Sequence, residues 1–220
     1  MSSELKKRIV TSFFLILLLI FMYNYSFILI LSLIILPIIA WIEFYALISK
    51  IVLDKKSKGQ FLRFLYKSIS LIYFFSLAYF LIIVDFKYDN LKIFIVYSLL
   101  VSVMSDVGGL ICGRIFKGKK LTKISPKKTI SGSIGSFAFS LFLIPFFKKD
   151  FYSYDFIMLI MITLLISLTT QLGDLFISYL KRKANVKDTS DLLPGHGGVL
   201  DRIDGIIFAL PVGVLLFNNF

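Results

Sequence analysis

Long apolar runs separated by short basic segments constrain this chain more than any other feature. The first run, from Ile9 to Ile48, is too long for one membrane span, because about 20 residues cross the hydrocarbon core. Hydrophobic residues make up 58% of the chain and charged residues 17%, whereas soluble domains average about 45–50% and about 25%. The sequence therefore predicts an all-α, polytopic transmembrane helical bundle, and not a soluble enzyme, a coiled coil or a disordered chain.

Division of the apolar runs at their polar interruptions predicts about seven spans. They cover roughly residues 9–24, 27–48, 68–84, 91–111, 134–147, 156–176 and 205–217. A signal peptide is the alternative for the first run, but no small-residue cleavage site follows and the apolar run resumes at once. No internal repeat is evident, so we expect a single integral membrane domain over residues 1–220. Its N-terminal spans lie at about 9–84 and its candidate catalytic half at about 105–205.

The basic residues predict the topology. With a cytoplasmic N-terminus, 21 of the 25 Lys and Arg residues fall on inner segments, as the positive-inside rule requires. The net charge of +12 then reflects basic inner loops beside anionic lipid, so we expect no nucleic-acid partner. Cys112 is the only cysteine and His196 the only histidine, which excludes intramolecular disulfides and sites that need several of either residue.

The first candidate segment runs from residue 105 to residue 135. Asp106 lies among apolar residues, and a carboxylate at membrane depth costs several kcal/mol unless it is paired, so it is a functional candidate. The glycines that follow permit close backbone approach to a ligand. Side chains suited to a polyphosphate come next: Ser125, Lys127, Lys128 and Thr129. The alternative is a basic loop facing lipid headgroups, with Gly109 and Gly113 in a mere helix contact.

The second candidate segment runs from residue 171 to residue 204. Asp174, Ser178 and Lys181 have the spacing of one helical face. Asp201 and Asp204 are three residues apart, so both can point to one side of the last helix at its start. Carboxylates from separate helix ends beside a glycine-rich loop are typical of a magnesium site, with basic residues holding the remaining phosphates. The alternative is a network of ion pairs that pins the loop to a helix.

His196 lies in the sequence Pro194-Gly195-His196-Gly197-Gly198. This histidine can be a packing residue, a phosphate contact or an acid–base group, and the sequence does not choose among these roles. No nucleophile-elbow motif accompanies it, which argues against a Ser-His-Asp triad. The chain also contains neither a P-loop nor a Rossmann fingerprint.

Together these residues resemble the phosphatidate cytidylyltransferase (CDP-diacylglycerol synthase) family. Its C-terminal signature is Ser-x-x-Lys-Arg, four residues, Lys-Asp, then Pro-x-His-Gly-Gly, two residues and Asp-Arg-x-Asp. It is met here by Ser178, Lys181, Arg182, Lys187, Asp188, Pro194, His196, Gly197, Gly198, Asp201, Arg202 and Asp204. The segment from Asp106 to Thr129 is also similar. The chain departs from the family at Ser131, which stands where a glutamate is usual.

The resemblance implies a nucleotidyltransferase that converts CTP and phosphatidate into CDP-diacylglycerol and pyrophosphate for phospholipid biosynthesis. It implies Mg²⁺, with or without a monovalent cation such as K⁺, held by Asp174 and Asp201, with Asp204 and Asp106 as further candidates. The implied catalytic residues are Asp174, Asp201, Lys187, Asp188, His196 and Arg202. The implied binding residues are Ser125, Lys127, Lys128, Thr129, Ser178, Lys181, Arg182, Gly197 and Gly198.

The resemblance also implies a place in the cell. We expect a protein of the bacterial plasma (inner) membrane whose active site faces the cytoplasm. Its expected partners are CTP, phosphatidate and membrane lipid, and a homodimer is compatible with the resemblance. One alternative changes only the lipid, as in a CDP-archaeol-type synthase or a CTP-dependent polyprenol kinase. A second is a transporter that uses Asp106 and Asp174 as a coupling site. A third is a non-catalytic homologue, to which Ser131 lends some support.

Overall fold

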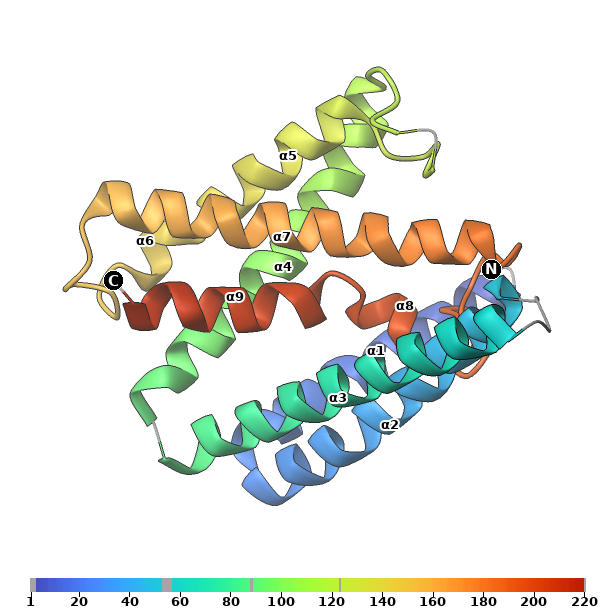
Figure 1. Ribbon diagram of the computed structural model, residues 1–220. Coiled ribbons are helices and arrows are strands. Elements are labelled where there is room, and N and C mark those ends of the chain that lie inside the picture. The colour runs from blue at the N-terminus through green and yellow to red at the C-terminus, as the bar shows by residue number, and fades with distance from the viewer. Residues whose placement is uncertain (1–2, 53–56, 88, 123, 220) are drawn as a thin grey trace. The chain divides into compact units, whose positions relative to one another are not determined.

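The computed structural model describes residues 3–52, 57–87, 89–122 and 124–219. Three of the predicted inner lysines, Lys55, Lys56 and Lys123, lie outside them. Regular structure in the described residues is helical apart from two isolated β-bridges (Figure 1). The predicted all-α fold is therefore confirmed, as expected for apolar segments that must satisfy their backbone groups internally in lipid.

Each of the seven predicted spans falls on helical structure. Among the described residues, five candidate spans are long and apolar enough to cross a membrane. They lie in α2 (Ser26–Ile51), α3 (Ser57–Lys87), α4 (Asp89–Phe116), α5 (Ile130–Leu141) together with α6 (Ile144–Phe147), and α7 (Phe156–Lys183). The first and last predicted spans fall on shorter apolar helical segments, residues 9–24 of α1 (Ser3–Asn24) and α9 (Ile206–Asn219).

The chain divides into two compact units. Unit 1 comprises residues 1–87 and 180–203, and unit 2 comprises residues 88–179 and 204–220. Unit 1 contains α1, α2, α3, the end of α7 and the short helix α8 (Leu200–Ile203). The prediction of one integral membrane domain is not tested by this division.

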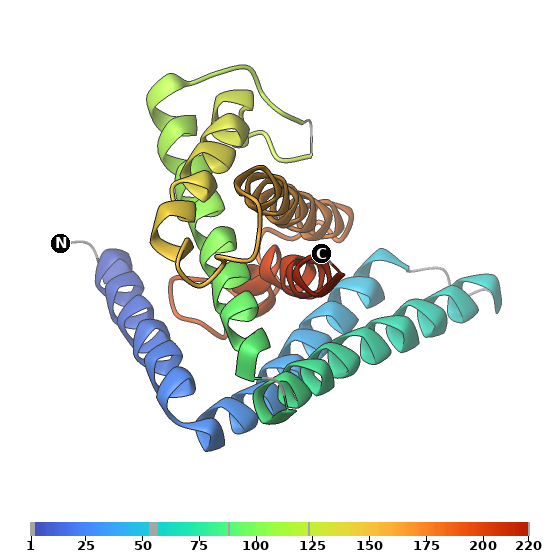
Figure 2. The same cartoon turned by 90° about the vertical axis from the view of Figure 1, so that its left-hand side faces the viewer.

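Helix α2 is the centre of unit 1, because α1, α3 and α8 all pack against it. Its buried residues include Ala40, Leu47 and Ile48. The turn between α1 and α2 is formed by Tyr25, whose backbone is extended. The side-chain amide of Asn24 closes the last turn of α1 by donating to the Ile20 carbonyl at 2.8 Å. The two helices diverge from this turn as a V (Figure 2).

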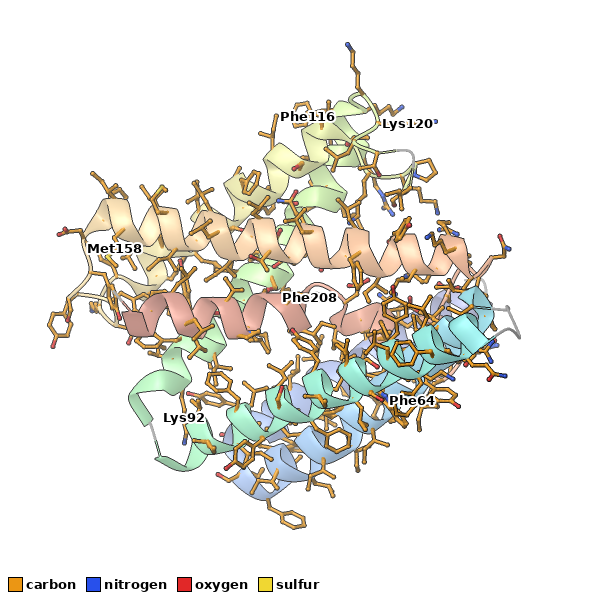
Figure 3. The ribbon with its side chains drawn as sticks, viewed as in Figure 1. Phe64, Lys92, Phe116, Lys120, Met158 and Phe208 are labelled. Atoms are coloured by element: carbon orange, nitrogen blue, oxygen red, sulfur yellow. The ribbon has the colours of Figure 1, made fainter. Side chains whose placement is uncertain are left out.

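Unit 2 has an aromatic core between α4, α7 and α9. Phe217 stacks on Phe94 and on Phe151, with ring centroids 4.7 and 4.8 Å apart. Buried Tyr97 hydrogen-bonds Thr163 Oγ1 across α4 and α7 at 2.6 Å. Figure 3 labels Met158 in α7, which packs against this core, and Lys120 in the loop at the other end of the unit.

Small residues bring α4 and α5 into close contact. A Cβ added to Gly108 would lie 2.4 Å from the Gly135 carbonyl oxygen, and one added to Gly132 would lie 2.8 Å from that of Gly109. These glycines therefore face the neighbouring helix. Of the two interpretations of the glycines in this segment, the structure supports a helix–helix contact and not a close approach to a ligand. The packing holds the two ends of the connecting loop, residues 117–129, next to each other.

Candidate active site

The signature residues from Lys187 to Gly198 lie in unit 1 and form a folded loop between α7 and α8. The backbone N–H of Leu193 donates to the Gly197 carbonyl at 2.8 Å, and that of His196 donates back to the Leu193 carbonyl at 2.8 Å. Gly195 and Gly197 have φ values of 75° and 81°, a region that other residues rarely adopt. The glycines of this motif are therefore required by the turn itself.

Asp201 ties the two sides of this loop together from the first turn of α8. Its Oδ1 accepts from Lys181 Nζ at 2.6 Å. Its Oδ2 accepts from the backbone N–H of Thr189 at 2.7 Å, from the Thr189 hydroxyl at 2.9 Å and from the backbone N–H of Gly198 at 2.9 Å. The Asp201 residue is only 8% exposed, so these bonds compensate for the removal of its charge from water.

The same contacts fix the ionisation state of Asp201. Burial of the carboxyl group raises its pKa, but the hydrogen bonds from Lys181 and from two backbone amides outweigh this, and the pKa is lowered below its ordinary value. Asp201 is therefore an anion at neutral pH, and the loop closes around a fixed negative charge.

A second buried carboxylate, Glu43 in α2, holds the outer side of the loop. Its Oε1 accepts from the Ser190 hydroxyl at 2.6 Å and from the backbone N–H of Val199 at 3.0 Å. Its Oε2 accepts from the Thr189 hydroxyl and from the backbone N–H of Leu200, both at 2.8 Å. Glu43 is 5% exposed. A span of the N-terminal half of the chain therefore anchors the signature loop directly.

Sequence reasoning did not single out Glu43, although a signal was present. Glu43 interrupts the apolar run of residues 27–48, and an acid at membrane depth is a functional candidate by default. The same argument identified Asp106 and Asp174. The hydrogen-bond partners of Glu43 lie about 150 positions away in the chain, so local spacing could not reveal its role.

His196 rests against α1. Its Nε2 lies 3.2 Å from the Ser12 hydroxyl, and the Thr11 hydroxyl donates to the Pro194 carbonyl at 2.9 Å. The buried Nδ1 of His196 has no hydrogen-bond partner among the described residues. Helix α1 thus positions the histidine through its other ring nitrogen.

The remaining predicted residues of unit 1 differ in exposure. Lys181 is buried and forms an ion pair with Asp201. Arg182 Nη1 donates to the Val186 carbonyl at 3.3 Å. The side chains of Lys187, Asp188, Arg182 and Arg202 are exposed. The loop and the helices that flank it therefore carry three exposed cationic signature residues.

Unit 2 brings together a second group of predicted residues. Lys128 pairs with the carboxylate of Asp174, and the Ser178 hydroxyl donates to the same carboxylate at 3.3 Å. The Asp174–Ser178 contact is the one-turn contact that their spacing predicts. The Lys128–Asp174 pair joins the basic loop to α7 within this unit.

The basic loop is fixed by its own backbone. The N–H of Leu121 donates to the Lys128 carbonyl at 2.8 Å, and the N–H of Ile130 donates to the Lys119 carbonyl at 2.9 Å. The Thr129 hydroxyl caps α5 by accepting from the N–H of Gly132 at 3.0 Å. Ser131, where the resemblance leads one to expect glutamate, contacts the Thr129 hydroxyl at 3.0 Å. Lys127 is exposed, and Ser125 and Lys128 are partly buried.

The two further acidic candidates differ in exposure. Asp106 is exposed on α4. Asp204 is buried, and one of its carboxylate oxygens accepts from the N–H of Gly205 at 2.9 Å. Helix α8 ends at Ile203 and α9 begins at Ile206, so Asp201 and Asp204 are not on one continuous helix as their spacing suggested. A Cβ on Gly205 would lie 2.6 Å from a Thr170 methyl, which indicates close packing at this break.

Acidic, cysteine and histidine side chains do not gather in threes anywhere in the described parts of the chain. Of the two carboxylates expected to hold a metal, Asp174 belongs to unit 2 and Asp201 to unit 1. Each has a lysine as its ion-pair partner.

The fold and these contacts define a class of protein. It is a polytopic helical membrane protein whose glycine-rich signature loop folds around buried carboxylates. Residues 2–220 match the model of the cytidylyltransferase family. The chain belongs to that family.

Curated relatives agree with this assignment. A protein named phosphatidate cytidylyltransferase from Rickettsia typhi is 44% identical over 132 residues, which are 56% of this chain and 57% of the relative. Proteins of the same name from Helicobacter pylori and Staphylococcus haemolyticus are 42% and 43% identical over 124 and 122 residues, or 56% and 54% of this chain and 47% and 46% of those relatives. The chain thus matches about half the length of these curated relatives.

Proposed function

We propose that this protein transfers the cytidylyl group of CTP to phosphatidate, giving CDP-diacylglycerol and pyrophosphate. The observation that carries the proposal is the signature loop, closed around ionised Asp201, with the exposed cations Lys187, Arg182 and Arg202 in the loop and in the helices that flank it. The relatives named phosphatidate cytidylyltransferase support the same substrates. Phospholipid biosynthesis is the process that this reaction would serve.

The reaction asks the protein mainly to position and neutralise two anions. A phosphate oxygen of phosphatidate forms a bond to the α-phosphorus of CTP, while the bond from that phosphorus to the bridging oxygen breaks and pyrophosphate leaves. A phosphate monoester has its second pKa near 6, so the attacking oxygen is already ionised near neutral pH. Exposed cations such as Lys187, Arg202 and Lys127 would offset the repulsion between the reactants.

Asp174 and Asp201 suit Mg²⁺ in donor type, because this ion prefers hard oxygen ligands and usually keeps water and phosphate oxygens as well. The Asp174 side chain is 27% exposed. Asp201 uses Oδ2 for the three bonds of the loop, which leaves Oδ1, now bonded to Lys181, as the oxygen that could turn to a metal. Bound Mg²⁺, with or without K⁺, would neutralise charge on the triphosphate. Asp204 and Asp106 remain second candidates.

We further propose that the protein works in a bacterial plasma membrane with the signature loop on the cytoplasmic side. The positive-inside distribution of Lys and Arg supports this orientation. It would place the loop on the side of the membrane where CTP is found.

The proposal is tested by following CDP-lipid formation by the detergent-purified protein with CTP, Mg²⁺ and a panel of acceptors. Phosphatidate should give CDP-diacylglycerol, and diacylglycerol, which lacks the attacking phosphate, should give no product. Product only with an archaeal-type ether phosphatidate, or phosphorylation of a polyprenol, would contradict the proposed substrate.

A further inference from the structure

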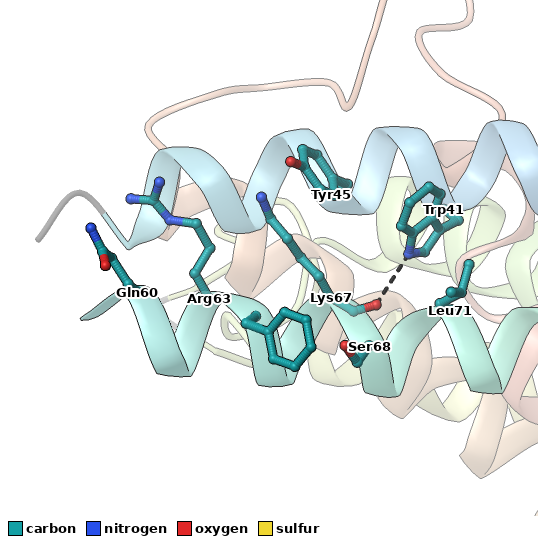
Figure 4. A pocket seen from close by; sticks show the side chains of 8 residues that line it. Trp41, Tyr45, Gln60, Arg63, Lys67, Ser68 and Leu71 are labelled. Atoms are coloured by element: carbon teal, nitrogen blue, oxygen red, sulfur yellow. Dashed lines mark hydrogen bonds between the residues drawn. The ribbon is translucent and has the colours of Figure 1, made fainter. Parts of the chain in front are cut away.

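A cavity of about 340 Å³ lies between α2 and α3 within unit 1. Figure 4 shows Trp41 and Tyr45 on α2 opposite Arg63, Lys67 and Leu71 on α3. Phe64 of α3 also lines the cavity. None of its lining residues belongs to the signature loop or to any group assigned above to the transfer reaction. Its volume is in the range of small-molecule sites.

Two cations one helical turn apart face this cavity. The side chains of Arg63 and Lys67 both extend from α3 toward α2 (Figure 4). The Arg63 guanidinium donates to the Val52 carbonyl at the end of α2, but its buried Nε has no hydrogen-bond partner among the described residues. The ammonium group of Lys67 lies 3.2 Å from the centroid of the Tyr45 ring.

The positive charges of Arg63 and Lys67 are not neutralised within the cavity, because none of its described lining residues is acidic. A buried donor without a partner is costly, and an anionic oxygen would supply the partner that Arg63 Nε lacks. Arginine and lysine side by side are well suited to a phosphate group.

Besides the polar residues Gln60 and Ser68, the rest of the wall is apolar and aromatic, contributed chiefly by Trp41, Phe64 and Leu71. The Trp41 indole is oriented by its N–H, which donates to the Lys67 carbonyl at 3.2 Å. The cavity is lined from the C-terminal half of the candidate span in α2 and from the N-terminal part of the candidate span in α3. Tryptophan, tyrosine and basic residues are enriched at this depth, the headgroup level of a bilayer.

We propose that this cavity binds the headgroup of one anionic membrane phospholipid. Its phosphate oxygens accept from Arg63 and Lys67, and its glycerol and first acyl carbons lie against Trp41, Phe64 and Leu71. The bound lipid joins α2 to α3, and α2 is the helix whose Glu43 holds the signature loop. The proposal does not depend on the transfer reaction, because binding here involves no CTP.

Native mass spectrometry of the full chain in detergent tests this. The protein is titrated in separate arms with phosphatidylglycerol, phosphatidate, phosphatidylcholine and inorganic phosphate. We expect one tightly retained anionic lipid, and retention about tenfold weaker or more in the double variant Arg63→Gln/Lys67→Gln. Lys50→Gln is the matched control, because Lys50 is exposed in the last turn of the same α2 and does not line the cavity.

Equal lipid retention by the wild type and the double variant would overturn the proposal, as would equal retention of phosphatidylcholine and phosphatidylglycerol by the wild type. Binding of inorganic phosphate with no added retention of lipid would overturn the lipid assignment. A second variant, Trp41→Phe, keeps the aromatic wall and both cations, so its result does not depend on the double variant being folded. This variant should still retain anionic lipid in preference to phosphatidylcholine. Loss of that preference would also count against the proposal.

Discussion

Seven donors of the loop and its flanks lie within hydrogen-bond distance of two buried carboxylates, Asp201 and Glu43, and the Thr189 hydroxyl lies within reach of both. Four of these donors belong to Thr189, Ser190 and Gly198, so the middle of the loop is fixed on both sides. The loop is also closely packed at Gly198. A Cβ added there would lie 2.0 Å from the Thr189 hydroxyl oxygen and 2.5 Å from Glu43 Oε2. Close packing at Gly198 thus adds to the hydrogen bonds that fix the loop.

Replacement of Glu43 by glutamine should loosen the loop. The variant removes the charge that four donors share, and bonds to a charged group contribute about 1.5–3 kcal/mol each. Hydrogen exchange at the amides of Val199 and Leu200 should accelerate by roughly tenfold or more. Ser190→Ala, which removes only one of the four bonds, is the matched control and should have a smaller effect. Exchange at the wild-type rate in Glu43→Gln would show that this carboxylate does not hold the loop.

The lowered pKa of Asp201 predicts a pH dependence of stability. A carboxyl group whose pKa is lower in the folded state stabilises that state above its unfolded pKa, about 3.9, and loses this contribution as the pH falls through the folded value. The difference in apparent Tm between wild type and Asp201→Asn should therefore be constant from pH 5 to 8 and shrink below about pH 4. A difference that changes near neutral pH would mean that Asp201 titrates there, contrary to its contacts.

At the scale of elements, the contact between α4 and α5 positions the basic loop that carries Lys127 and Lys128. Interfaces of membrane helices favour small residues because close approach replaces the hydrophobic effect. Hydrogen bonds add to this contact: the Ser136 hydroxyl donates to the Ser105 carbonyl at 2.7 Å. The position of the basic loop therefore depends on the glycine contact between α4 and α5.

Gly108→Ala should destabilise unit 2 strongly. Its Cβ would lie 2.4 Å from a backbone oxygen of Gly135 and 2.7 Å from Phe139 Cβ, so the helices must separate, at a cost of about 1–3 kcal/mol. An apparent Tm measured in detergent should fall by several degrees. Val107→Ala, at the exposed neighbouring position on α4, is the control and should change it little. An unchanged Tm in Gly108→Ala would contradict the close packing.

The helices could be predicted from sequence because lipid leaves an apolar chain few alternatives, and the positions of α2 and α7 follow from hydropathy alone. The break between α8 and α9 could not, because it depends on close packing at Gly205 that no local pattern encodes. The Gly109–Gly113 spacing allowed two interpretations, and only the position of α5 decided between them. For the site, the pairing of Asp174 with Ser178 follows from helix periodicity, whereas that of Lys181 with Asp201 needs a loop of 20 residues to close.

At the scale of the whole molecule, the proposed orientation can be tested with single cysteines. In a Cys112→Ser background, Lys119→Cys reports on a predicted inner loop and Lys149→Cys on a predicted outer loop; both positions are exposed. A membrane-impermeant maleimide should label Lys149→Cys in intact bacterial spheroplasts, and Lys119→Cys only after lysis. The reverse pattern would place the N-terminus and the basic loops outside, contrary to the positive-inside rule.

The central claim is that the loop closed by Asp201 serves cytidylyl transfer, and pyrophosphate release tests it most directly. The purified protein is given CTP, phosphatidate and Mg²⁺, beside Asp201→Asn and the matched variant Asp191→Asn, which alters an exposed acid of the same loop outside the signature. We predict phosphatidate-dependent release that falls by at least about a hundredfold in Asp201→Asn and persists in Asp191→Asn. No release from folded wild-type protein, or equal release from Asp201→Asn, would contradict the account.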